Sequence, residues 1–137
     1  MVQLVMGLKG SGKTKRLIEM VNAALLEESG DVVVIEKDKK LTYDIPYQAR
    51  LVFASDYSIG TVEFFKGLLS GLHAGNYDIT HIFIDNFVKM MPGVTEEQIE
   101  EFLRWLDAFS QKENVTFTVS MTLDPDAVSE EIRKYSI

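Results

Sequence analysis

The sequence contains no cysteine, and only two of its 137 residues are histidine. The absence of cysteine excludes disulfides, thiol catalysis and a cysteine-ligated zinc site. Neither His73 nor His81 has a metal-ligating or catalytic residue at the sequence spacing typical of such sites, so we expect both to be structural. No apolar run approaches membrane-spanning length, and the first residues do not have the pattern of a signal peptide. We therefore expect a soluble protein of the reducing cytoplasm, with no membrane partner.

Positive charge is also scarce. Lysine and arginine together number 14 against 21 acidic residues, which gives a formal net charge of −7. Because phosphate backbones are held by clustered basic residues, this balance argues against nucleic acid as a partner. Hydrophobic residues make up 46% of the chain, and 137 residues suffice for one sizeable core. We expect a single domain over residues 1–137.

The most informative stretch that is present covers residues 7–14, with the sequence GLKGSGKT, and matches the pattern G-x-x-x-x-G-K-[ST]. It follows an apolar run at residues 2–6 and precedes residues 15–28, where apolar residues recur at helical spacing. Glycines let successive N–H groups of such a loop point inward at phosphate oxygens, and the helix dipole adds to their effect. The sequence therefore predicts a phosphate-binding loop. A plain glycine-rich turn between strand and helix is the alternative.

The residue types in this stretch suggest a role for each position. We expect a bound nucleotide to contact Gly7, Lys9, Gly10, Ser11, Gly12, Lys13, Thr14 and Lys15. Lys13 would reach the β- and γ-phosphates, and the Thr14 hydroxyl would bind Mg²⁺. No acidic residue precedes Glu19, so the electrostatic potential around this stretch is positive and suits a polyphosphate. The guanine-reading pattern N-K-x-D of GTPases is absent, which favours ATP.

The rest of the chain alternates between strand-like and helix-like segments. Further strands are predicted at residues 32–35, 50–54, 81–85 and 115–120. Helices are predicted from Ser55 or Ser58 to about His73, from a capping box at residues 95–98, and from Asp124 onward. This alternation predicts an α/β three-layer sandwich with a mostly parallel sheet of about five strands.

Two connecting segments are expected to be irregular. Residues 37–48 are polar, and residues 87–93 form a loop with several large apolar side chains. We expect this second loop to be tucked under the sheet, although exposure to a partner is the alternative. Residues 120–122 lie at the carboxyl end of the last predicted strand, and a hydroxyl there could sense a γ-phosphate or simply end the strand.

The strand at residues 81–85 ends in a carboxylate. In nucleotide-binding folds that begin with a phosphate loop, an aspartate at the end of an apolar strand orients the metal or a metal-bound water. Asp85 is therefore predicted to bind Mg²⁺ together with Thr14. Lys13 and Asp85 are the two predicted catalytic residues.

This order of elements resembles the P-loop NTPases of the RecA-like branch, and among them the nucleotide-binding core of the bacterial-type thymidine kinases. The resemblance rests on residues 7–14, 32–37, 53–56 and 82–85. It implies that Gly10, Gly12, Lys13 and Thr14 bind nucleotide phosphates, with Asp85 at the metal. It also implies that the strand before Asp85 lies two places from the loop strand, and the strand ending at Glu36 three.

The chain departs from that family in two respects. It lacks the zinc module of those kinases, and Asn86 stands where they carry a catalytic glutamate. Asparagine cannot accept a proton at neutral pH. Glu36, Asp38 and Asp56 are candidates for a replacement base, because all three should lie at the ligand edge of the sheet.

These observations lead to one functional hypothesis and two alternatives. We expect a Mg-ATP-binding protein with slow or partner-dependent hydrolysis. The first alternative is a small-molecule or nucleoside kinase with an acceptor pocket from residues 37–60 and 87–94. The second is a nucleotide-regulated interaction module in which residues 37–48 and 87–93 carry the output. A protein partner or a second copy of the chain is compatible with all three.

Overall fold

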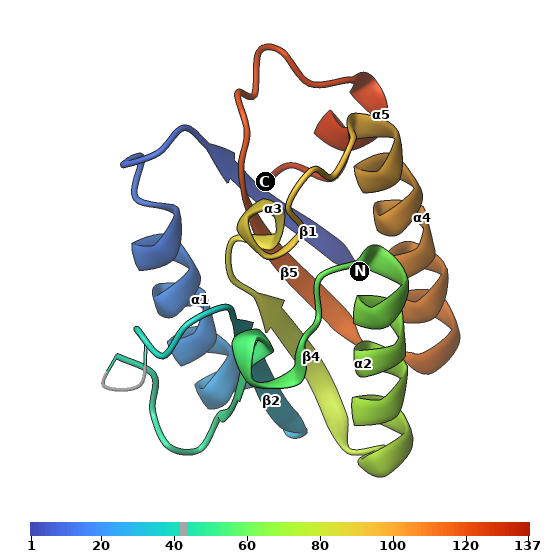
Figure 1. Ribbon diagram of the computed structural model, residues 1–137. Coiled ribbons are helices and arrows are strands. Elements are labelled where there is room, and N and C mark those ends of the chain that lie inside the picture. The colour runs from blue at the N-terminus through green and yellow to red at the C-terminus, as the bar shows by residue number, and fades with distance from the viewer. Residues whose placement is uncertain (42–43) are drawn as a thin grey trace.

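The computed structural model describes residues 1–41 and 44–137 (Figure 1). The elements follow in the order β1 (Val2–Gly7), α1 (Lys13–Glu27), β2 (Asp31–Glu36), β3 (Arg50–Phe53), the 3-10 helix η1 (Ala54–Tyr57), α2 (Val62–Gly75), β4 (Ile79–Ile84), α3 (Phe87–Met90), α4 (Glu96–Glu113), β5 (Thr116–Thr122) and α5 (Glu130–Arg133). None of the helices in the described part of the chain combines the length and the apolar character that a membrane span needs.

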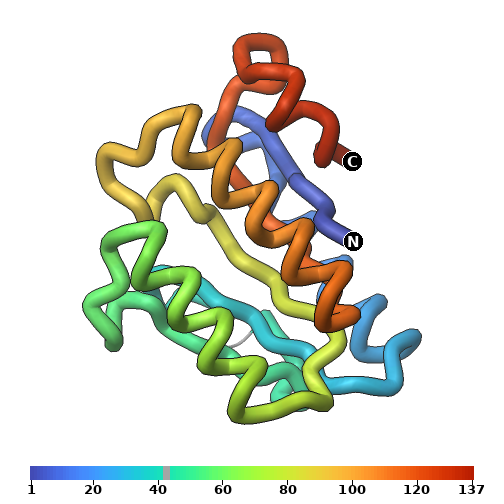
Figure 2. The backbone as a smooth tube through the Cα atoms, turned by 90° about the vertical axis from the view of Figure 1, so that its right-hand side faces the viewer, coloured from blue at the N-terminus to red at the C-terminus, as the bar shows by residue number. Residues whose placement is uncertain are grey.

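In the described residues, five strands run parallel in one sheet, in the order β1-β5-β4-β2-β3. Helix α1 lies on one face of the sheet, and α2 and α4 lie side by side on the other (Figures 1 and 2). The predicted three-layer α/β sandwich is confirmed. Strand β5 separates β1 from β4, so the strand before Asp85 lies two places from the loop strand and β2 three, as the resemblance implied.

The core lies on both faces of the sheet, and β2 shows why. Its four central residues, 32–35, are all buried, as an apolar run without alternation predicts. Val33 and Ile35 pack with the side chains of α2 and α4. Val32 and Val34 pack with α1 and with the segment that follows β2. This burial on two sides fixes where the carboxyl ends of the strands lie.

Helix α2 begins later than its predicted start at Ser55 or Ser58. Residues 54–57 form the 3-10 helix η1, and Ser58 takes a left-handed conformation with φ 53° that interrupts the chain before a helix can continue. Thr61 caps α2 instead, since its Oγ1 accepts a hydrogen bond from the N–H of Phe64 at 3.3 Å. The capping box predicted for α4 is present at Thr95 and Gln98.

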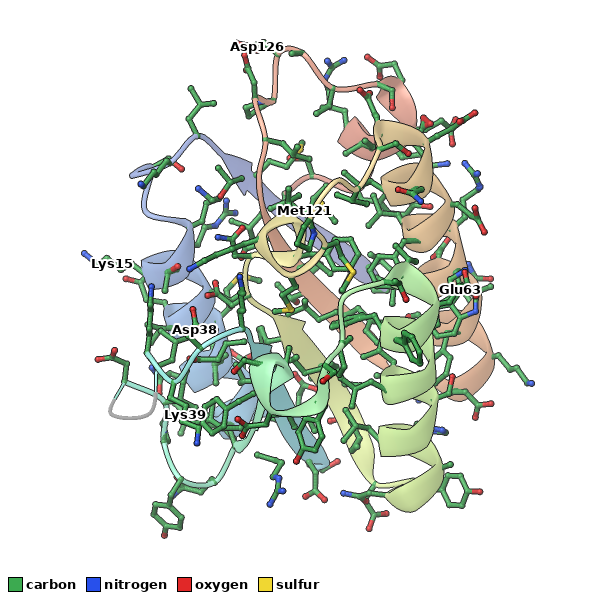
Figure 3. All side chains as sticks on the ribbon, in the orientation of Figure 1. Lys15, Asp38, Lys39, Glu63, Met121 and Asp126 are labelled. Carbon is green, nitrogen blue, oxygen red and sulfur yellow. The ribbon has the colours of Figure 1, made fainter. Side chains whose placement is uncertain are left out.

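The predicted start of the last helix at Asp124 is also wrong. The Asp124 carboxylate accepts a hydrogen bond from the N–H of Asp126 at 3.0 Å, which closes a local turn. Helix α5 begins only after Ser129, whose N–H and hydroxyl both bind glutamates of α4. Figure 3 shows Asp126 at the tip of the loop between β5 and α5.

The segment after β4 contains the short helix α3, where a loop was expected. Phe87, Met90 and Met91 are buried there, as predicted for a tucked segment. The ring of Phe87 stacks on Phe102 of α4 at 4.3 Å between centroids. This burial weighs against the interaction-module hypothesis, in which the same segment carries the output.

Both histidines are buried, which agrees with a structural role. His81 Nδ1 lies 2.6 Å from Glu28 Oε2, and its Nε2 lies 2.8 Å from Thr118 Oγ1. Burial lowers the pKa of the His81 imidazole, and the carboxylate of Glu28 partly opposes this effect. The network ties the C-terminal end of α1 to β4 and β5.

Candidate functional site

Residues 7–14, called the glycine loop from here on, connect β1 to α1 by a tight backbone turn. Gly10 and Gly12 have φ angles of 82° and 84°, a region that favours glycine over other residues. Gly7 is needed for a different reason, because a Cβ there would overlap the Oγ of Ser11 and lie 3.0 Å from its Cβ. The loop therefore folds closely over the end of β1, as a phosphate-binding nest requires.

Helix α1 starts at Lys13, so its N-terminus opens onto the glycine loop. The first turn contains no acidic residue, and no side chain caps it. Its first N–H groups and the positive end of its dipole thus suit an anion. The ammonium of Lys13 lies over the loop, where it donates hydrogen bonds to the carbonyl of Leu8 at 2.8 Å and the hydroxyl of Ser11 at 3.4 Å.

Asp85 directly follows β4, at the carboxyl edge of the sheet, and its side chain contacts the first turn of α1. Its Oδ1 accepts hydrogen bonds from the hydroxyl of Thr14 at 3.4 Å and that of Ser120 at 3.1 Å. Burial raises the pKa of the Asp85 carboxyl, and these two hydrogen bonds oppose the increase. Thr14 and Asp85, the two predicted metal ligands, are thus in contact.

A hollow of about 400 Å³, called the loop hollow, joins the glycine loop to the ends of β4 and β5. Its lining residues are Lys9, Gly10, Gly12, Lys13, Thr14, Lys15, Asn86, Ser120 and Thr122. Six of the eight predicted nucleotide-binding residues are in that set, and Gly7 and Ser11 instead shape the loop beneath it. Lys15 extends outward from the first turn of α1 (Figure 3).

The donor set fits a magnesium ion bound together with a nucleotide. Within residues 1–41 and 44–137 there is no cluster of three or more histidine and acidic side chains of the kind that holds a metal alone. Magnesium in nucleotide sites needs less from the protein, because it uses one or two side-chain oxygens together with phosphate oxygens and water. The Thr14 hydroxyl and the Asp85 carboxylate supply those oxygens beside the loop hollow.

A much smaller hollow of about 40 Å³ is lined in part by Asp85 and shares Asn86 with the loop hollow. Glu36, Lys37, Asp38, Lys40, Asp85, Asn86 and Lys89 line this small hollow. Two of the three acids considered as replacement bases, Glu36 and Asp38, are therefore beside Asp85. Asp56 does not line it and pairs with Lys39 at 3.8 Å. Figure 3 shows Asp38 and Lys39 on the chain that leaves β2.

Glu36 is 2% exposed, and the backbone of its own loop holds its carboxylate. Its Oε2 accepts a hydrogen bond from the N–H of Leu41 at 3.1 Å, and Lys40 donates a second. Burial raises the pKa of the Glu36 carboxyl, although these hydrogen bonds oppose the increase. Asp38 instead pairs with Lys89 at 3.6 Å.

A third hollow, of about 340 Å³, lies beyond the small hollow and shares Lys37 with it. Its lining residues are Lys37, Ala54, Ser55, Ser58, Ile59, Gly60, Met90 and Pro92. These residues come from the segments from which an acceptor pocket was expected, residues 37–60 and 87–94. We call it the side hollow.

Sequence reasoning assigned no role at the site to Lys37 or Lys89, which line the small hollow. Their positions offered a signal, since Lys37 directly follows β2 and Lys89 lies in the short helix after Asp85. Neighbouring parallel strands bring such strand-end residues to one edge of the sheet.

The chain matches no protein-family model, and no curated protein matches its sequence. The function of the site therefore has to follow from its own geometry and chemistry.

Proposed function

We propose that the protein binds Mg-ATP at the glycine loop and hydrolyses it slowly or in response to a partner. The contact between Thr14 and Asp85 carries the proposal, because it places a hydroxyl and a carboxylate side by side at the mouth of a glycine nest. That combination is the protein's share of a magnesium-nucleotide site. The cytoplasm, which supplies ATP and Mg²⁺, is the compartment that we propose for it.

Each residue of the loop hollow has a distinct part in this proposal. The backbone N–H groups around Gly10 and Gly12 bind the phosphates, and Lys13 exchanges its contacts with Leu8 and Ser11 for phosphate oxygens. Thr14 and Asp85 hold the metal ion, which when bound neutralises charge on the phosphates. Ser120 orients the Asp85 carboxylate through its hydroxyl.

Slow hydrolysis follows from how the acids are placed. Asn86 cannot take a proton from an attacking water. Glu36 is the best replacement among the acids that line the small hollow, because burial raises the pKa of its carboxyl, whereas Asp38 is paired with Lys89. Two backbone N–H groups nevertheless occupy the Glu36 carboxylate. A partner or substrate that moves residues 37–41 would free it.

Titration calorimetry with Mg-ATP tests the proposal. We expect binding to wild type, and a loss of about 10- to 100-fold in affinity for Lys13→Ala, since a charge-assisted contact contributes about 1.5–3 kcal/mol. Lys112→Ala is the matched control, because Lys112 is exposed on α4 and does not line the loop hollow. Absence of ATP binding to wild type up to millimolar concentrations would refute the proposal, as would an equal effect of the two variants.

The side hollow favours a second candidate function, a kinase for a small molecule. It has an apolar wall at Ile59, Met90 and Pro92 and polar groups at Lys37, Ser55 and Ser58. Such a mixture suits a small organic acceptor. The small hollow shares Lys37 with the side hollow and Asn86 with the loop hollow, which supports a path between an acceptor and the phosphates.

Phosphate transfer from radiolabelled ATP across a panel of nucleosides and small hydroxyl compounds tests this second function. A labelled product that is lost in Ile59→Trp, with ATP affinity unchanged, would support it. If ATP binds and no compound in the panel is labelled, the kinase hypothesis is rejected and the ATPase hypothesis remains.

A further inference from the structure

Asn86 takes an unusual backbone conformation directly after Asp85. Its φ and ψ are 53° and 63°, in the left-handed region, which asparagine tolerates better than most residues. Its N–H donates a hydrogen bond to the Ser120 hydroxyl at 2.7 Å. The turn at this residue ends β4 and starts α3, so the side chain is set at the carboxyl edge of the sheet.

The side-chain amide of Asn86 is oriented by β5. Its Oδ1 accepts a hydrogen bond from the hydroxyl of Thr122 at 3.3 Å. Within residues 1–41 and 44–137 no hydrogen bond uses its Nδ2, so two N–H donors remain. Asn86 lines both the loop hollow and the small hollow, so the residue that carries these donors borders both.

This position is where the terminal phosphate of a triphosphate would lie. Lys13 and Thr14 line the same loop hollow as Asn86, and the Thr14 hydroxyl donates a hydrogen bond to Asp85, the residue before Asn86. A glutamate at residue 86 would add a second negative charge beside Asp85 and repel the phosphate. A neutral amide with free donors attracts it instead, because hydrogen bonds to charged oxygens are stronger than those between neutral groups.

The geometry points to Asn86 as the residue that distinguishes ATP from ADP, by donating from Nδ2 to an oxygen of the γ-phosphate. This assignment rests on the proposed function. Asn86, which stands in place of a catalytic base, would then recognise the terminal phosphate of the nucleotide.

Calorimetry with Mg-ADP and a non-hydrolysable Mg-ATP analogue tests the assignment in Asn86→Gly, which keeps the left-handed backbone and removes the amide. We expect the affinity for the analogue to fall at least about tenfold and the affinity for ADP to change less than about twofold. Thr122→Val, which removes the hydroxyl that orients the amide, should lower only the affinity for the analogue, by a smaller factor.

Asn114→Gly is the matched control, because Asn114 is also left-handed, with φ 56°, but lies before β5 at the opposite edge of the sheet. It should change neither affinity. Equal losses for the analogue and ADP in Asn86→Gly, or an unchanged affinity for the analogue, would overturn the assignment while leaving the proposed function intact. If wild type binds neither nucleotide, the proposed function fails and this assignment fails with it.

Discussion

The hydroxyl of Thr14 lies 3.4 Å from a carboxylate oxygen of Asp85, although 71 positions separate the two residues in the sequence. The contact exists because α1 starts at the glycine loop while β4 ends at the same edge of the sheet, with β5 between β4 and β1. Ser120 of β5 donates to the same oxygen of Asp85. Three elements thus converge on one carboxylate beside the loop hollow.

The close fit of Gly7 under the glycine loop predicts an effect on binding. Gly7→Ala would push Ser11 away, because the new Cβ would overlap the Ser11 side chain. We expect ATP affinity at least about tenfold lower, since overpacking of this kind costs about 1–3 kcal/mol and falls on the loop itself. Calorimetry measures the change. Gly60→Ala, where a Cβ meets open space, is the control, and equal affinities for the two variants would contradict the account.

The partly buried Asp85 carboxylate predicts a dependence of stability on pH. Burial raises its pKa above the usual 3.8, so the folded protein binds this proton more tightly than the unfolded chain does. The ligand-free protein therefore loses stability as the pH rises through the raised pKa. Asp85→Asn removes this loss, so it should raise the free energy of unfolding at pH 7 and have a smaller effect below about pH 4.

Urea denaturation of wild type and Asp85→Asn at the two pH values measures this difference. Asp126→Asn, at the exposed tip of the loop after β5, controls for the loss of a negative charge. A destabilising effect of Asp85→Asn at pH 7 would show that the carboxylate supports the fold rather than the site.

Helix α2 offers a prediction that concerns stability alone. The spacing of Gly67 and Gly71 is compatible with close helix packing or with simple helix weakening, and a Cβ on either would meet nothing within 4 Å. Close packing at these glycines is therefore absent. Gly67→Ala should stabilise the protein by about 0.5–1 kcal/mol, because alanine favours the helix over glycine. Thermal unfolding checks this, and a loss of stability would show that Gly67 has a packing role.

Local signals in the sequence were sufficient for much of the fold. The glycine loop, the buried run before Glu36 and the capping box at Thr95 each depend on neighbours within a few residues, and each is present as predicted. The start of α5 could not be predicted in this way. It depends on Ser129 binding Glu96 and Glu100, which lie about 30 positions earlier.

The candidate site likewise combines features that the local sequence predicts with features that depend on distant contacts. Residue types in the glycine loop and at Asp85 were sufficient to predict that Thr14 and Asp85 belong together. The hydrogen bonds from Ser120 and Thr122 to Asp85 and Asn86 follow from the strand order, which no local pattern contains. The sequence indicates that Asn86 stands in place of a glutamate, but only the structure shows that Thr122 binds its side-chain oxygen and that it lines two hollows.

The Mg²⁺ dependence of ATP affinity tests the central claim most directly. We predict that Mg²⁺ strengthens ATP binding to wild type by at least about tenfold, and that Asp85→Asn loses most of this gain, since the carboxylate is one of two protein ligands. ATP affinity without Mg²⁺ should be unchanged or higher in the variant, because a negative charge is removed. An equal gain from Mg²⁺ in wild type and Asp85→Asn would contradict the account.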